Sequence, residues 1–313
     1  MCKPLHLILR SILNNVPQRR VISCCMLLWG QPPSAAQSSP VRPVRHATVH
    51  NKNVPFTLSH AAAALPFRRC RLVTSALVIG TFAPDFEYFL HLTPEDRFGH
   101  TLRGTFVLTL PLALAVLWLF HRFVKATVAR LLPESIERRL QPNLGNFRFG
   151  GPARFLLVLL SLLLGIATHL LWDSFTHRNT WLYKRWSFLR QPIRLPIFAM
   201  TPCYKVLQHG STIAGLAVLA VCFIWWYRSS PPWSQNPNPY PRLTTAQKLA
   251  IVTTLTAIAS AAAIVRAVVG SESSHLVLEN FVAQAVVTVI ALMWWELVIY
   301  GLFLSANEIR LKP

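Results

Sequence analysis

Five long apolar runs constrain this chain more than any other feature of its sequence. Each has about 18 or more residues with almost no charge, the length that an α-helix needs to cross the hydrocarbon core of a bilayer. The runs lie near residues 104–121, 155–172, 210–227, 249–269 and 281–304. The sequence therefore predicts an all-α, multi-pass transmembrane helical bundle with about five crossing helices.

The charge of the chain indicates its surroundings. Charged residues make up only 13% of the chain. The chain has 31 Lys and Arg but only 11 Asp and Glu, so its net charge is +20. A basic excess of this size attracts either nucleic acid or anionic lipid. The apolar runs favour lipid, and the chain has no nucleic-acid or phosphate-loop motif. We expect the lipid bilayer and its anionic head groups as partners, and no nucleic acid.

Residues 1–53 differ in composition from the rest of the chain. They contain seven Lys or Arg, no acid, and the stretch QPPSAAQSSPVRPVR. Such a segment is interpreted as a disordered basic arm or as a start codon assigned too far upstream, with a signal peptide as the alternative. Residues 54–313 are the predicted membrane domain.

A shorter apolar run precedes the first span. LVTSALVIGTFA, from Leu72, has 12 residues, which suits a packed or re-entrant helix better than a crossing one. We expect short helices in this region to form an N-terminal layer that carries His60 and Asp85.

The string HLLWDSFTH is the most informative motif. If the second span continues as a helix through it, His169, Asp173 and His177 are spaced i, i+4 and i+8 and form one stripe. Imidazole and carboxylate groups arranged in this way bind divalent ions that activate water. The alternative is that His169 and Asp173 only hydrogen-bond each other at a helix end.

The predicted topology brings further polar groups to the same side of the membrane. Two successive crossings return the chain to the side it left, so the end of the second span lies beside the segment before the first and the start of the third. Seven side chains meet there: His60, Asp85, His100, His169, Asp173, His177 and His209. Ionisable groups at membrane depth are costly and indicate function.

We predict that these seven groups form a site for a divalent metal, zinc in view of the histidine content. Asp85 and Asp173 are the candidate catalytic carboxylates, and His209 is a ligand or a supporting donor. For Glu87, Glu95 and Asp96, which lie near Asp85 and His100 in the sequence, solvation is the favoured interpretation and a supporting role at the site is the alternative.

Several sequence blocks resemble a known family. They are VPFTLSHAAAALPF, LVIGTFAPDFEYFL, RFGHT, LGIATHLLWDSFTHRNTW and TPCYKVLQHGS. Together, over residues 54–230, they resemble an uncharacterised bacterial membrane family, domain of unknown function 4184. Its members open with Met-Pro-Phe-Thr-Leu-Ser-His, where this chain has Val54-Pro55-Phe56-Thr57-Leu58-Ser59-His60. The resemblance implies a bacterial inner (cytoplasmic) membrane.

That family is distantly similar to predicted membrane-bound metal-dependent hydrolases. Through its His-x-x-x-Asp element it is also similar to zinc-dependent phospholipase C and nuclease enzymes. This similarity reaches His169 and Asp173, and the chain has no counterpart of the N-terminal tryptophan ligand of those phospholipases, which argues against a three-metal site.

The favoured function is metal-assisted hydrolysis at the bilayer face, with a lipid phosphoester as substrate because of where the site lies. A proton-coupled carrier that uses the same His/Asp cluster, and a structural membrane protein, are the alternatives. Lys and Arg are shared almost evenly between the two sides, so the positive-inside rule gives no orientation.

Overall fold

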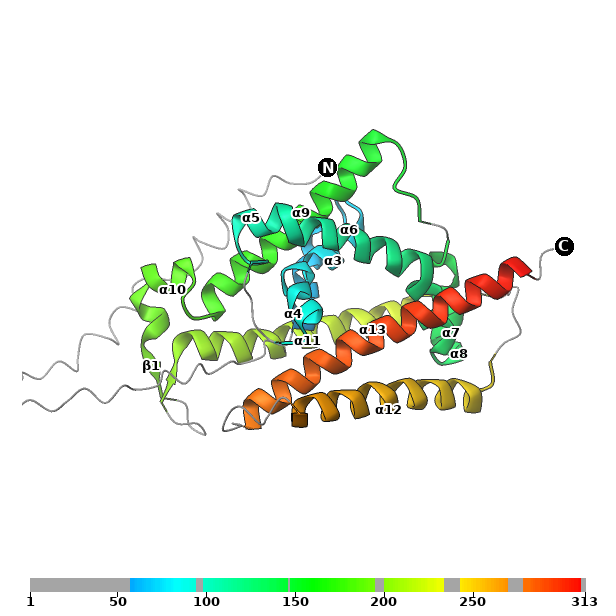
Figure 1. Ribbon diagram of the computed structural model, residues 1–313. Coiled ribbons are helices and arrows are strands. Elements are labelled where there is room, and N and C mark those ends of the chain that lie inside the picture. The colour runs from blue at the N-terminus through cyan, green and yellow to red at the C-terminus, as the bar shows by residue number, and fades with distance from the viewer. Residues whose placement is uncertain are drawn as a thin grey trace, which may run out of the picture. The chain divides into compact units, whose positions relative to one another are not determined.

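The computed structural model describes residues 57–93, 98–145, 147–194, 200–233, 243–269 and 278–310 (Figure 1). The N-terminal extension predicted at residues 1–53 lies outside these described residues, as do Glu95 and Asp96. Within them, helices make up nearly all of the regular structure. The two-residue strands β1 (Pro192–Ile193) and β2 (Thr201–Pro202) pair antiparallel.

Five helices are long and apolar enough to cross a membrane, which confirms the prediction. They span Leu102–Leu131, Pro152–Arg185, Cys203–Ser229, Thr245–Val269 and Phe281–Ala306. Many of their large apolar side chains face outward, and those of Val107 and Ile213 are each 70% exposed. Exposed apolar area on this scale suits a lipid environment.

The first of these helices is assembled from several segments. It runs through α5 (Leu102–Gly104), η3 (Thr105–Thr109), α6 (Leu110–Leu119), η4 (Phe120–Val124) and α7 (Lys125–Leu131). The segments η3 and η4 are π-helical, so each turn there holds more residues than an α-turn.

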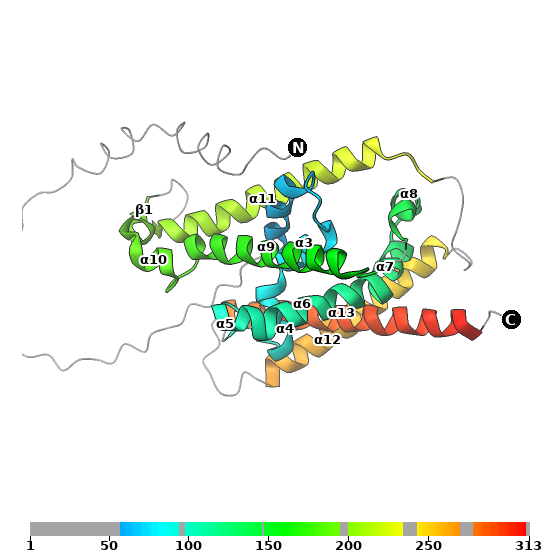
Figure 2. The same cartoon turned by 90° about the horizontal axis from the view of Figure 1, so that it is seen from above.

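The second and third spans lie in contact with each other. They are α9 (Pro152–Thr176), which α10 (Trp181–Arg185) follows, and α11 (Cys203–Ser229) (Figure 2). The fourth and fifth are α12 (Thr245–Val269) and α13 (Leu278–Arg310), which pack along each other. The short elements α8 (Glu134–Leu140), η5 (Gln141–Asn143) and η6 (Ser187–Arg190) belong to the connections.

A layer of short helices precedes the first span, as the sequence predicts. It consists of η1 (Thr57–Phe67), α3 (Thr74–Gly80), η2 (Ala83–Asp85) and α4 (Phe86–His91). The elements η1 and η2 are 3₁₀ rather than α-helical. The short apolar run forms α3, which packs against α9, and η1 packs against α11.

Two glycines set the distance between α3 and α9. A Cβ on Gly80 would overlap the carbonyl oxygen of Leu162, and a Cβ on Gly165 would overlap that of Leu77. The two backbones therefore touch, and a buried apolar core forms around the contact: Ala76, Ile79, Ala83, Ala113, Leu117, Val158, Leu162 and Ile166. This close packing fixes where the chain leaves α3 and enters η2.

Candidate metal centre

Six of the seven candidate site residues lie close together in the structure. Asp173 is the centre of the group, because its carboxylate lies within 3.1–3.7 Å of a ring nitrogen from each of four histidines. Asp85 lies 3.5 Å from two of those histidines. The six residues are His60 on η1, Asp85 on η2, His100 between α4 and α5, His169 and Asp173 on α9, and His177 at the C-terminal end of α9.

Four of these residues face one another with a spacing that suits a metal. Asp85, His100, His169 and Asp173 each offer one ligand atom, and all four atoms lie within 4.8 Å of one another. Nε2 of His169 lies 3.1 Å from Asp173 Oδ2 and 3.5 Å from Asp85 Oδ1. Nε2 of His100 lies 3.7 and 3.5 Å from the same two oxygens. Ligand atoms bound at about 2.0–2.1 Å to a tetrahedral zinc ion lie about 3.3 Å apart.

The ring of His169 is held in the orientation that a ligand needs. Its Nδ1 lies 2.8 Å from the carbonyl oxygen of Thr81, which can only accept a hydrogen bond, so Nδ1 carries a proton. In the neutral ring, Nε2 then presents its lone pair to the two carboxylates. A backbone acceptor behind the ring in this way is typical of metal-binding histidines.

Burial and charge make the cluster an unusual environment for Asp85. Its side chain is fully buried, which alone would raise the pKa of the carboxyl group. The neighbouring imidazoles of His169 and His100 outweigh burial and hold the pKa of Asp85 below its usual value. Asp85 is therefore an anion in a buried site, and it requires positive charge beside it.

A clamped turn positions His100. The carboxylate of Glu87 accepts hydrogen bonds from the backbone N–H groups of Phe98, at 3.0 Å, and of Gly99, at 2.7 Å. The hydroxyl of Thr109 donates to the carbonyl oxygen of Gly99 at 3.1 Å. Glu87 is only 3% exposed, so the expectation that it is solvated is wrong. Nothing in the sequence other than its closeness to Asp85 indicated this role.

The ring of His100 supplies positive charge beside the two carboxylates. Burial tends to lower its pKa, but contacts with Asp173 and Asp85 raise the pKa to about 9. In the metal-free cluster its ring is therefore protonated at neutral pH. A divalent cation would take the place of such protons, because ligands must bind it in their deprotonated form.

His60 and His177 face the other oxygen of Asp173. Nε2 of His60 and Nδ1 of His177 each lie 3.5 Å from Asp173 Oδ1. The ring of His60 stacks on that of His169 with 4.3 Å between centroids. Burial, and then the nearby His169, lower the pKa of His60 to about 4, so it is neutral at pH 7.

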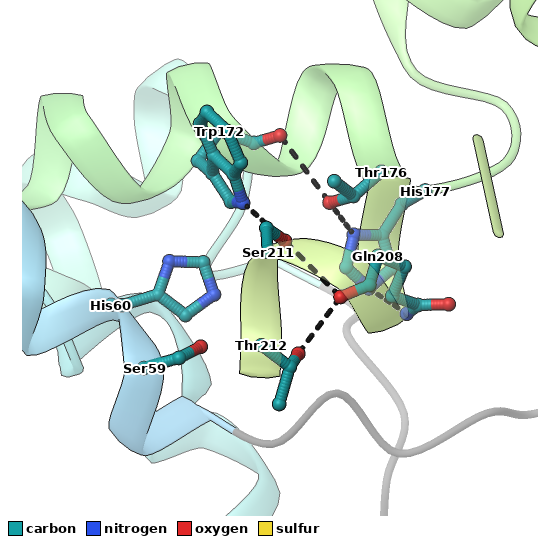
Figure 3. A pocket seen from close by; sticks show the side chains of 8 residues that line it. All are labelled: Ser59, His60, Trp172, Thr176, His177, Gln208, Ser211 and Thr212. Carbon is teal, nitrogen blue, oxygen red and sulfur yellow. Dashed lines mark hydrogen bonds between the residues drawn. The ribbon is translucent and has the colours of Figure 1, made fainter. Parts of the chain in front are cut away.

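A small pocket opens on this side of Asp173 (Figure 3). Its interior has room for about one water molecule. Its lining is polar and carries no acidic or strongly basic side chain: His60 and His177, Trp172, Gln208, and the hydroxyls of Ser59, Thr176, Ser211 and Thr212. The amide of Gln208 donates to Nε2 of His177 at 3.2 Å.

His209 is the candidate that the structure does not bring into the cluster. It is exposed on α11, whereas its neighbour Gln208 is buried and contacts His177. One residue along a helix corresponds to a rotation of about 100°, so the motif LQHGS lies beside the site through its glutamine instead of its histidine. Sequence reasoning missed Gln208, Trp172 and Ser211.

Comparisons with other proteins identify a family for this chain and nothing more. No curated protein and no solved structure matches it. The model of the family described as domain of unknown function DUF4184 matches residues 54–302, which include every residue of the cluster. The chain belongs to the DUF4184 family.

Proposed function

We propose that Asp85, His100, His169 and Asp173 bind one divalent metal ion and that the protein is a membrane-embedded, metal-dependent hydrolase. The observation that carries the proposal is the set of four N–O separations of 3.1–3.7 Å among these residues. Two imidazoles and two carboxylates form a ligand set that suits zinc. The two carboxylates balance the charge of a divalent cation.

Asp173 has a further role in this proposal, because its two oxygens face different groups. Oδ2 faces the ligand nitrogens, while Oδ1 faces His60 and His177. A bound divalent ion would lower the pKa of a water molecule at the site. Oδ1 of Asp173, together with the imidazoles beside it, would accept the proton from that water.

These groups can account for every bond and proton in the hydrolysis of a phosphoester. The water oxygen forms a bond to phosphorus, and the bond from phosphorus to the leaving oxygen breaks with its electron pair. The proton taken from the water returns, by way of His60 or His177, to the leaving oxygen. Asp85 stays ionised throughout as a ligand and a counter-charge.

The position of the site supports a lipid phosphoester as the substrate. His169 and Asp173 lie in the last two turns of α9, and residues of an interfacial kind follow that helix. Trp181, Lys184, Arg185, Trp186 and Arg190 are all exposed there. Aromatic and basic side chains in such a belt suit a surface of anionic lipid head groups. We place the protein in the inner (cytoplasmic) membrane of a bacterium, as the family resemblance implies.

Metal content tests the proposal directly. Wild type, Asp173→Asn and His169→Ala are purified in detergent, loaded with zinc, passed through a desalting column and measured by elemental analysis. Each variant removes a ligand and makes the span less polar, so insertion into the membrane is preserved. We expect about one zinc per wild-type chain and at least tenfold less in the variants.

Glu134→Gln is the matched control, because that carboxylate is 58% exposed and pairs with Arg138 outside the cluster. Equal zinc content in wild type and both ligand variants rejects the metal centre. The same His/Asp cluster would then be a proton relay of a carrier or a structural network.

A further inference from the structure

The ring of His177 is held at both of its nitrogens (Figure 3). Its backbone follows the last turn of α9, where its N–H donates to the carbonyl oxygen of Asp173 at 3.0 Å. Nδ1 of the ring lies 3.1 Å from Thr176 Oγ1 and 3.5 Å from Asp173 Oδ1. Nε2 lies 3.2 Å from the amide nitrogen of Gln208 on α11. These partners decide which of the two nitrogens carries the proton of the neutral ring.

The two groups beside Nδ1 both act as acceptors. The hydroxyl of Thr176 donates to the carbonyl oxygen of Trp172 at 3.3 Å, and a hydroxyl has only one hydrogen. Its oxygen therefore meets Nδ1 with a lone pair, and the carboxylate of Asp173 has no hydrogen to give. A lone pair on Nδ1 would face only other lone pairs, so Nδ1 carries the proton.

The group beside Nε2 is a donor. An amide nitrogen has hydrogens and no available lone pair, so Gln208 donates to a lone pair on Nε2. The side chain of Gln208 is only 6% exposed, and its Oε1 makes no hydrogen bond within the described part of the chain. A buried acceptor left without a donor is destabilising by about 1–3 kcal/mol, which an apolar side chain of similar shape would avoid. Packing alone therefore does not explain a glutamine here, whereas its contact with His177 does.

This arrangement takes both nitrogens of His177 out of metal binding. A metal ion needs a ring nitrogen with a free lone pair, but Nδ1 has a proton and Nε2 is occupied by the amide. The Nδ1–H group instead faces Oδ1 of Asp173, whose other oxygen faces the ligand nitrogens. Carboxylates that bind metals are typically oriented by such donors.

We propose that His177 is an orienting donor to Asp173 and not a metal ligand, and that Gln208 and Thr176 are positioning residues that keep its proton on Nδ1. The inference rests on the proposed function for the ion at Oδ2 of Asp173. It also narrows the proton path there, because a nitrogen that already carries a proton cannot take another from Oδ1. Of the two imidazoles that face this oxygen, His60 remains as the carrier.

Nitrogen-15 NMR distinguishes the two tautomers directly. The full chain is labelled with nitrogen-15 histidine, stripped of metal with a chelator and measured in detergent at neutral pH. A ring nitrogen with a proton and one with a lone pair give well-separated signals, and those of His177 are the signals that disappear in His177→Gln. We expect a proton on Nδ1 and a lone pair on Nε2, the reverse of the tautomer that free histidine prefers in water. A proton on Nε2, with or without one on Nδ1, overturns the inference.

Gln208→Glu tests the positioning role, because it replaces the amide donor by an acceptor of the same shape. We expect Nε2 of His177 to gain a proton in this variant. Gln191→Glu makes the same chemical change at an exposed residue and should leave the His177 signals as in wild type. Thr176→Val, which removes the hydroxyl at nearly constant shape, is the second test if Gln208→Glu does not fold, and it should give a mixture of the two tautomers. A variant that folds and keeps the wild-type tautomer rejects the positioning role.

Zinc loading of the same labelled protein separates this inference from the proposed function. We expect zinc to bind while the proton stays on Nδ1 of His177. Loss of that proton when zinc binds would identify His177 as a ligand and reject the inference, while the metal centre would stand. The expected tautomer in a protein that binds no zinc would preserve the orientation of His177 and reject the metal centre.

Discussion

Replacement of Glu87 by Gln should weaken zinc binding although Glu87 is not a ligand. Its carboxylate is buried and holds the backbone N–H groups of Phe98 and Gly99 immediately before His100. Glutamine keeps the shape of the side chain but removes its charge. One of its two terminal atoms also becomes an N–H donor in a place where two backbone donors converge.

The size of the effect follows from these two hydrogen bonds. A bond to a charged group contributes about 1.5–3 kcal/mol and a neutral one about 0.5–1.5 kcal/mol, so the lost charge costs about 1 kcal/mol per bond. The turn is then about 2 kcal/mol less stable. If zinc binding must restore the turn, its dissociation constant rises about 30-fold, since each 1.4 kcal/mol is a factor of ten.

Competition with a chromophoric zinc chelator in detergent measures this dissociation constant, and thermal unfolding with and without zinc measures the accompanying stability. Glu134→Gln makes the same chemical change at an exposed carboxylate and should leave zinc affinity within twofold of wild type. Glu87→Asp, which keeps the charge, should recover part of the loss. A Glu87→Gln protein that binds zinc as tightly as wild type would refute the positioning argument.

Three other changes test separate parts of the structure. Gly165→Ala should destabilise the protein by about 1–3 kcal/mol and lower its melting temperature, because the added Cβ meets the backbone of α3; Gly210→Ala, with no atom within 4 Å of its added Cβ, is the control. The melting temperature of the metal-free protein should peak near pH 6.5. His100, with its pKa raised to about 9, contributes stability that is lost as pH rises from about 6.5 to 9. His60, with its pKa lowered to about 4, contributes stability that is lost as pH falls from about 6.5 to 4. His100→Gln should flatten the alkaline slope, and an unchanged slope would contradict the assignment. A chain that starts at Val54, replaced by Met, should insert into membranes like the full chain, as membrane fractionation would show; failure to insert would make residues 1–53 a targeting element.

The sequence predicted the five crossing helices and the meeting of the polar residues for simple physical reasons. The length of an apolar run decides whether a helix can cross a bilayer, and the order of crossings decides which ends share a side. The i, i+4 spacing on α9 then placed His169 and Asp173 on one face. These arguments need no knowledge of side-chain packing.

The sequence could not predict what depends on helix rotation or on turns. The choice between Gln208 and His209 depends on which face of α11 meets α9, and a span that is apolar on nearly every side gives no periodicity to decide it. The role of Glu87 depends on a turn whose N–H groups point at its carboxylate. A lone Glu among other acids near a histidine gives no sign of that geometry.

The π-helical start of the first span makes the site depend on the number of residues in the chain as well as on their identity. Thr109, the last residue of η3, donates to the carbonyl oxygen of Gly99 from the end of this wider turn. Deletion of one residue from Thr105–Thr109 would leave the span as apolar as before, but it would remove the wider turn that sets where Thr109 stands relative to Gly99. Two relatives with equally apolar first spans, one residue different in length, can therefore differ in whether His100 reaches the cluster at all.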